Sequence, residues 1–149
     1  MVTISQSALL PYSAEQMFAL VNDIAAYPQF MQGCLNAEVL SVVRAGKAEE
    51  VTARLDLGKA GLRYSLTTRN RLQAPEQMTM TLVDGPFAAF TAEWRFVPLA
   101  AEACKTCLDM SFEFRAGLID AALSALFEAT SRDLVNAICK RAEYLYGKK

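Results

Sequence analysis

The feature that most constrains the fold is an alternation of apolar and polar residues that runs, with breaks, from residue 34 to residue 115. A period of two is typical of a β-strand with one buried face. The alternation is clearest over residues 62–72, and short turn sequences separate the runs. Short connections and one polar face per strand predict about six consecutive antiparallel strands.

The N-terminal residues predict one further strand and two short helices. Residues 2–10 alternate like the later strands, and Ser13 with Gln16 has the spacing of a capping box at a helix N-terminus. Asp23 can cap a second short helix. We expect Tyr27-Pro28 to interrupt that helix, because the residue before a proline avoids the α region.

The last part of the chain changes to a helical period, with apolar residues at spacings of three, four and seven. This pattern predicts one amphipathic helix of roughly 28 residues. Such a helix needs an apolar surface, which the strands supply if their sheet bends around it. We therefore predict an α+β fold in a single domain, residues 1–149, with a curved antiparallel sheet of about seven strands around a long C-terminal helix. Small side chains on the helix predict a cavity beneath it: Ala121, Ala122, Ala125, Ala129, Ala137 and Ala142.

Composition excludes several classes of site. The chain has no histidine, which removes Ser-His-Asp triads, His-ligated metals and the commonest general base. Its formal charge of −1 does not favour a general polyanion binder, so no DNA partner is expected. Cys104 and Cys107 have C-x₂-C spacing, but no second pair completes a zinc site.

The N-terminus lacks the basic and apolar regions of a signal peptide. No apolar run approaches the roughly 18 residues that would span a bilayer. We therefore expect a cytoplasmic protein whose four cysteines are thiols.

Several short sequences in this chain resemble one protein family. The resemblance begins with Pro11-Tyr12-Ser13 through Met17, Leu20–Asp23, Tyr27-Pro28-Gln29-Phe30 and Gly33-Cys34. It continues with Thr67–Asn70, Leu82–Phe87, Trp94–Leu99 and Phe112-Glu113-Phe114. In this order, from about residue 3 to 146, they resemble the ribosome-association and coenzyme Q-binding branch of the START-like superfamily, also called polyketide cyclase-like or helix-grip proteins. Met31-Gln32 departs from the Leu-Pro pair that is usual in the family.

The resemblance implies a helix-grip fold and two activities. One is non-enzymatic binding of ubiquinone or a similar polyprenyl lipid in support of respiration, with no cofactor required. The alternative is a toxin that associates with the large ribosomal subunit and blocks its joining to the small one. A peripheral membrane contact would allow ligand exchange. An enzyme acting on a polyketide-like substrate is disfavoured, because no acid–base pair can be placed in the cavity.

The predicted ligand site consists mainly of aromatic and methionine side chains on the inner face. Asn70, beside Thr68, is the polar candidate for binding a quinone carbonyl, although a neighbouring backbone group is an alternative partner. Phe87 and the loop 27–30 are predicted to form the rim of the cavity, with a simple turn at 84–87 as the alternative. The predicted ligand-binding residues are Tyr64, Asn70, Met78, Met80, Phe87, Phe90, Trp94, Phe112, Phe114 and Leu126.

A set of arginines on the outer face is the predicted contact for the alternative, ribosomal activity. They form either a local basic stripe that meets ribosomal RNA or an ordinary charged surface interleaved with acids. The predicted residues are Arg54, Arg63, Arg69, Arg71 and Arg95.

Overall fold

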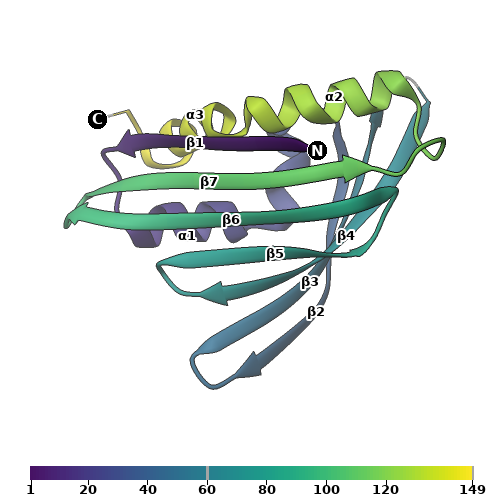
Figure 1. Ribbon diagram of the computed structural model, residues 1–149. Helices are drawn as coiled ribbons and strands as arrows, with labels where there is room; N and C mark the ends of the chain where they lie inside the picture. Colours follow the sequence, from purple (N-terminus) through teal and green to yellow (C-terminus); the bar gives the residue numbers. More distant parts are fainter. Residues whose placement is uncertain (60, 149) are drawn as a thin grey trace.

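Seven strands form one antiparallel sheet in the computed structural model, which describes residues 1–59 and 61–148 (Figure 1). The strand order is β1-β7-β6-β5-β4-β3-β2, so the first strand pairs with the last and the other neighbours are joined by hairpins. The strands are β1 (Val2–Leu10), β2 (Cys34–Ala45), β3 (Ala48–Lys59), β4 (Leu62–Gln73), β5 (Gln77–Asp84), β6 (Phe87–Ala100) and β7 (Ala103–Phe114). The helices are α1 (Ala14–Asn22), the 3-10 helix η1 (Ile24–Gln29), α2 (Ala121–Arg132) and α3 (Leu134–Tyr146). This architecture confirms the predicted α+β fold.

The short helices follow β1 and begin at the predicted capping box. Ser13 Oγ accepts a hydrogen bond from the Gln16 backbone N–H at 3.1 Å, and Gln16 Oε1 accepts one from the Ser13 N–H at 2.9 Å. Asp23 precedes η1 but its side chain makes no capping bond. The prediction that Tyr27-Pro28 interrupts this helix was wrong, since η1 continues to Gln29. The Tyr27 carbonyl accepts hydrogen bonds from the N–H groups of residues 30 and 31, so the helical turn continues past Pro28.

The C-terminal helix is divided at Asp133, so the prediction of one continuous helix was wrong. The backbone nevertheless continues in the helical direction, because the Asp133 N–H bonds to the Ala129 carbonyl at 3.2 Å and Ala137 N–H bonds to the Asp133 carbonyl at 2.9 Å. Figure 1 shows α2 and α3 following one another along the sheet.

The buried side chains of these helices are Leu123, Ser131, Leu134, Val135, Ile138 and Ala142, whereas Leu145 is exposed. Most of the alanines that were predicted to open a gap lie on the outside. Ala121, Ala122, Ala125 and Ala129 are exposed, so they do not form the cavity.

The C-terminal end of α3 is fixed to the beginning of the chain. Tyr12, which is buried, donates a hydrogen bond to the Gly147 carbonyl at 2.7 Å. Tyr146 donates one to the Gln16 carbonyl at 3.0 Å, and the two tyrosine rings lie 5.7 Å apart. These contacts hold α3 against the β1–α1 junction.

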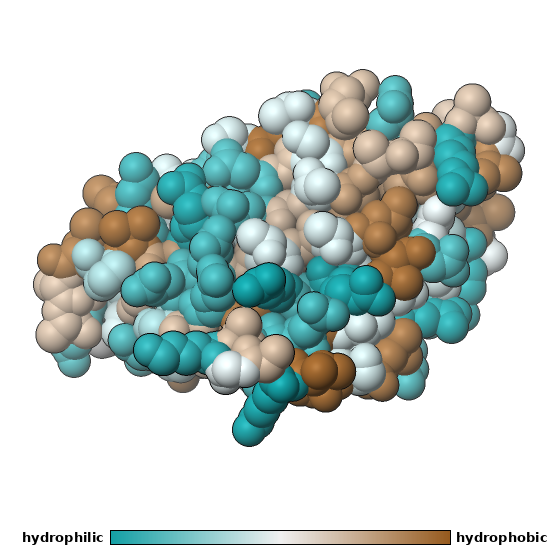
Figure 2. Space-filling model, turned by 60° about the horizontal axis from the view of Figure 1, so that its bottom comes forward, coloured by the Kyte–Doolittle hydropathy of each residue, from teal (hydrophilic) through white to brown (hydrophobic). Residues whose placement is uncertain are grey.

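The edge strand β2 leaves apolar side chains exposed. A bulge between Val39 and Ser41 shifts its register against β3. The view in Figure 2, which brings the lower part of Figure 1 forward, shows hydrophobic residues between hydrophilic ones on the surface. The exposed aliphatic residues of β2 are Leu35, Val39, Leu40, Val42 and Val43.

Among the described residues, no helix is both long and apolar enough to cross a membrane.

We expect Ser13→Ala to lower the free energy of unfolding by about 0.5–2 kcal/mol, because it removes the capping acceptor of α1. Urea denaturation measures the change. Ser7→Ala, at an exposed position of β1, is the control and should leave stability nearly unchanged. An equal loss in both variants would contradict the role of the cap.

Candidate functional site

A cavity of about 70 Å³ lies between the sheet and the C-terminal helices. The inner faces of β3 to β7 form one wall, and α2, α3 and the segment from η1 to Gly33 form the other. Its lining residues are Tyr27, Met31, Gln32, Gly33, Leu55, Leu57, Gly58, Tyr64, Leu66, Met80, Phe90, Trp94, Met110, Leu126, Phe127, Thr130, Ser131, Leu134 and Ile138. None of these lining residues carries a formal charge at neutral pH.

The strand wall follows from the alternation, since inward residues two apart on one strand both reach the cavity, as Tyr64 and Leu66 do. The helical wall follows from the spacing of four between Leu126 and Thr130, which places both on one face of α2. Gly33 has a φ of 80°, and a side chain there would come within 3.3 Å of Leu126 Cδ2. Glycine therefore serves both the backbone conformation and the packing of Leu126.

The structure places five of the ten predicted ligand residues on the cavity wall and five away from it. Those on the wall are Tyr64, Met80, Phe90, Trp94 and Leu126. Those away from it are Asn70, Met78, Phe87, Phe112 and Phe114. Apart from Phe87, which was predicted to lie at the rim, these residues were predicted to face inward. An inward direction alone does not distinguish a residue on the cavity wall from one packed behind it.

Three of the misplaced residues form an aromatic cluster behind Phe127. The Phe87 and Phe114 rings stack at 4.3 Å, and Phe127 lies 4.8 Å from Phe112 and 5.3 Å from Phe87. Phe87 is fully buried, so the prediction that it forms the rim was wrong. The cluster instead packs against Phe127, one of the wall residues that the sequence analysis did not predict.

The loop after η1 contributes to the wall through residues that sequence reasoning missed. Met31, Gln32 and Gly33 line the cavity, and the Gln32 carbonyl accepts a hydrogen bond from Thr130 Oγ1 at 3.1 Å. The departure from the family pattern at Met31-Gln32 marks this segment, and the helical spacing from Leu126 points to Thr130. Both signals were present in the sequence.

Titratable groups at the cavity remain uncharged. Burial raises the pKa of the Tyr64 phenol well above its usual value. The pKa of Tyr27 is also raised, mainly by burial and to a smaller extent by the nearby Cys34 and Asp23. The Tyr27 hydroxyl donates a hydrogen bond to the Val21 carbonyl. Burial also raises to about 11 the pKa of Cys34, which follows the lining residue Gly33 but is not itself on the wall. The wall is therefore neutral and mostly apolar at physiological pH.

Thr68 and Asn70 form a hydrogen bond with each other and do not face the cavity. Both are buried, and Thr68 Oγ1 donates a hydrogen bond to Asn70 Oδ1 at 2.8 Å. Neither residue lines the cavity. The predicted polar contact to a ligand therefore has no geometric support at Asn70, and the polar groups on the wall are Tyr64, Thr130 and Ser131 among others.

The outer arginines are interleaved with acids. Arg54 pairs with Asp56 at 3.1 Å and Arg69 pairs with Glu50 at 3.2 Å. Arg95 bridges Glu93 and Asp109, each at 3.1 Å. Within the described ranges, Arg63 and Arg71 make no ion pair, which leaves two of the five predicted ribosome contacts free.

The acids of this face are held in their charged form. A hydrogen bond from Ser65, together with bonds from Asn36 and Arg54, holds the pKa of Asp56 below its usual value despite some burial. The hydroxyl of Ser5 and the guanidinium of Arg95 do the same for Asp109. The outer face is thus a mixed charged surface rather than a basic stripe.

The cysteines form no metal centre in the part of the chain that the structure describes. Cys104 and Cys107 are buried free thiols on β7, and Cys104 Sγ lies 3.5 Å from Thr106 Oγ1. No group of three His, Cys, Asp or Glu side chains gathers among residues 1–59 and 61–148.

The curved sheet, the helices along it and the neutral cavity between them define a START-like helix-grip protein. The chain belongs to the family described as "Polyketide cyclase / dehydrase and lipid transport", whose model matches residues 10–139. The ZhuI aromatase/cyclase from Streptomyces sp. R1128 has a similar fold, with a TM-score of 0.75, 21% sequence identity and coverage of 95% of this chain and 93% of that one. At this identity, the likeness concerns the fold alone.

Two curated relatives are similar over nearly the whole chain. The ribosome association toxin RatA of Escherichia coli (strain K12) is 40% identical over 149 residues, which are 100% of this chain and 92% of the relative. The mitochondrial coenzyme Q-binding protein COQ10 homolog B of Xenopus laevis is 30% identical over 149 residues, covering 97% of this chain and 59% of the relative. The family resemblance predicted from the sequence is thus confirmed.

We expect Asn70→Leu to lower the free energy of unfolding by about 1–3 kcal/mol, because it leaves the buried Thr68 hydroxyl without its acceptor. Thr68→Val and the double variant complete a double-mutant cycle in urea denaturation. The double variant should lose less than the sum of the single losses. Simple additivity would show that the two side chains are not coupled.

Proposed function

We propose that this chain binds ubiquinone or a similar polyprenyl lipid without catalysis, in the cavity between the sheet and the C-terminal helices. The observation that carries the proposal is the uncharged, mostly apolar lining of that cavity. Apolar ligands bind in such sites because burial removes their surface from water. The lipid-transport description of the family and the name of the coenzyme Q-binding relative support the same ligand class.

The size of the cavity determines how such a ligand binds. A volume of about 70 Å³ is smaller than the roughly 300–1,000 Å³ of sites that enclose a drug-sized molecule. The cavity thus accommodates a segment of a slender isoprenoid chain, and a larger group requires the wall to move. The mobile wall in this proposal is α2. Two hydrogen bonds link α2 to other elements. Thr130 donates to the Gln32 carbonyl in the loop after η1, and Gln6 Nε2 on β1 donates to the Arg132 carbonyl at 2.7 Å.

The proposal assigns no catalytic step to the cavity. General acid–base catalysis is most efficient when the pKa of the group lies near the working pH. Burial moves the pKa values of three groups in this region away from neutral pH. They are raised for the phenols of Tyr27 and Tyr64 on the wall and for the thiol of Cys34 beside it. The lining has no carboxylate or ammonium group to take that role.

We expect Leu126→Trp to abolish lipid binding by filling the cavity. Mass spectrometry of an organic extract from purified native protein measures the bound lipid. The matched control is Ala125→Trp, which adds the same side chain on the exposed face of α2. The wild type and the control should carry about one lipid per chain. An extract without lipid from wild type made in a quinone-replete host, or equal lipid in the Leu126→Trp variant, would contradict the proposal.

A second proposed function is association with the large ribosomal subunit in the cytoplasm. It is supported by the 40% identity, over the whole of this chain, to a relative named a ribosome association toxin. The two activities use different parts of the molecule, since the cavity is internal and a ribosomal contact must be on the surface.

We expect the wild-type chain to co-sediment with purified large subunits at low salt and to be released as salt rises, because phosphate contacts are salt-dependent. Small subunits are the control and should not retain it. A chain that stays in the supernatant at about 50 mM salt would rule out this second function and would leave the lipid proposal unaffected.

A further inference from the structure

A surface groove separate from the cavity lies between the end of η1 and α3. Its residues on α3 follow the spacing of a single helix face, and Gln29 at the end of η1 and the following Phe30 contribute the other side. The groove is lined by Gln29, Phe30, Asp133, Ala137, Lys140, Arg141 and Tyr144. None of these residues lines the cavity.

Arg141, one of the lining residues, is held in place by contacts from both sides of the groove. Its guanidinium carbon lies 5.2 Å from the centre of the Phe30 ring and 5.1 Å from that of the Tyr144 ring. Arg141 Nη2 also donates a hydrogen bond to Gln29 Oε1 at 3.1 Å. A guanidinium between two aromatic rings is oriented before any ligand arrives, and its other N–H groups remain available to an anion.

Tyr144 offers a flat surface to solvent. This residue is 77% exposed, more than any other large hydrophobic residue among residues 1–59 and 61–148. The ring contacts the Arg141 guanidinium, and none of the aromatic ring pairs of the described residues includes it. Base stacking does use exposed aromatic rings, because every nucleic-acid base has a π-face.

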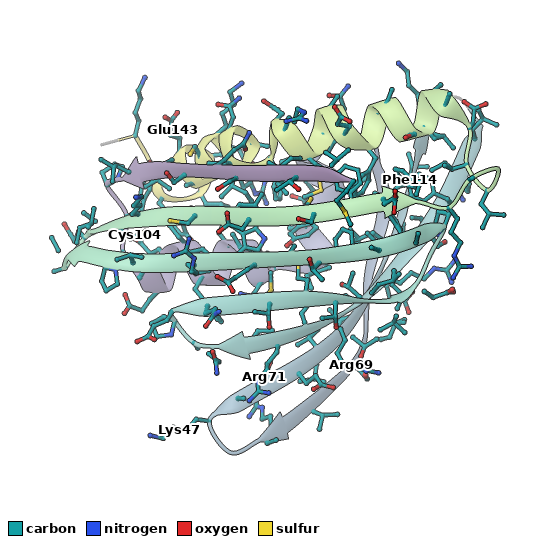
Figure 3. All side chains as sticks on the ribbon, in the orientation of Figure 1. Lys47, Arg69, Arg71, Cys104, Phe114 and Glu143 are labelled. Atoms are coloured by element: carbon teal, nitrogen blue, oxygen red, sulfur yellow. The ribbon has the colours of Figure 1, made fainter. Side chains whose placement is uncertain are left out.

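The charges of the groove favour an anion. Lys140 and Arg141 make no ion pair in the described part of the chain, whereas the acid of the groove, Asp133, accepts a hydrogen bond from Asn136 at 3.1 Å. The groove therefore has two free cations and one acid on a chain whose formal charge is −1. In Figure 3, Arg69 and Arg71 lie on the lower part of the sheet, far from α3, where Glu143 is labelled at the top.

We infer that this groove binds an unpaired nucleotide of ribosomal RNA, with the base stacked on Tyr144 and the phosphate beside Lys140 and Arg141. The inference rests on the second proposed function and places its contact on α3 and η1 rather than on the outer arginines. An acidic protein segment would match the charge but would leave the exposed ring unused. The combination of a flat ring, an oriented guanidinium and a free ammonium fits a nucleotide on all three counts.

Co-sedimentation with large subunits from Escherichia coli tests the stacking contact. Tyr144→Leu should weaken binding about fivefold or more, while Tyr144→Phe keeps the ring and should bind like the wild type. Both variants should keep the wild-type melting temperature, because the side chain is exposed. Equal binding of Tyr144→Leu and wild type would overturn the inference, whereas failure of the wild type to bind would remove the second proposed function itself.

The salt dependence of binding tests the phosphate contact. Lys140→Gln should reduce the slope of log affinity against log salt by about one. The matched control is Arg71→Gln, which removes an unpaired cation from the outer face and should leave the slope unchanged. A reduced slope in the control together with an unchanged slope in Lys140→Gln would move the contact to the outer face and overturn the inference.

Ultraviolet crosslinking of the wild-type complex identifies the partner molecule. Trypsin releases Tyr144 in the peptide 142–148, which follows Arg141 and ends at Lys148. A nucleotide adduct on Tyr144 in this peptide is the expected result. A crosslink from the peptide to a ribosomal protein alone would overturn the assignment to RNA.

Discussion

The packing of α3 against the sheet is the contact on which the remaining structure depends. Ile138 and Ala142 are almost fully buried, and the absence of a long side chain at Ala142 allows close approach. The paired tyrosines, Tyr12 and Tyr146, fix the far end of this helix. With α3 held there, α2 continues along the sheet. The side chains that line the cavity enclose the space between the sheet and these two helices.

The sequence predicted the elements of the fold because their signals are local. Alternation over residues 62–72 depends on neighbouring positions alone, as does the pairing of Ser13 with Gln16. The division of the helix at Asp133 had no such signal, since neither glycine nor proline marks it. The two halves share contacts with β1, but α2 also packs against β3, whereas α3 packs against α1 and β7.

The candidate site was harder to predict because it depends on distances between remote segments. The sequence showed that Phe90 and Phe112 face inward, but not that one lines the cavity and the other packs behind Phe127. The outer arginines illustrate the same limit. Arg69 lies opposite Thr52 in the register of β3 and β4, which brings it within reach of Glu50. Only the register reveals that pair.

The helix η1 takes part in both the cavity and the surface groove. Tyr27 lines the cavity, Phe30 lines the groove, and their rings lie 5.8 Å apart. A single turn of 3-10 helix therefore separates an internal apolar space from a charged external surface. This arrangement allows one small domain to carry two chemically different surfaces without a second core.

The division of the helix at Asp133 also has a consequence for how the family can diversify. The anchoring contacts belong to α3, whereas Leu126, Phe127 and Thr130 belong to α2. Substitutions in α2 can therefore alter the shape of the cavity while the anchor that maintains the fold stays unchanged. The anchor concerned is the pair of hydrogen bonds from Tyr12 to Gly147 and from Tyr146 to Gln16, which no residue of α2 makes.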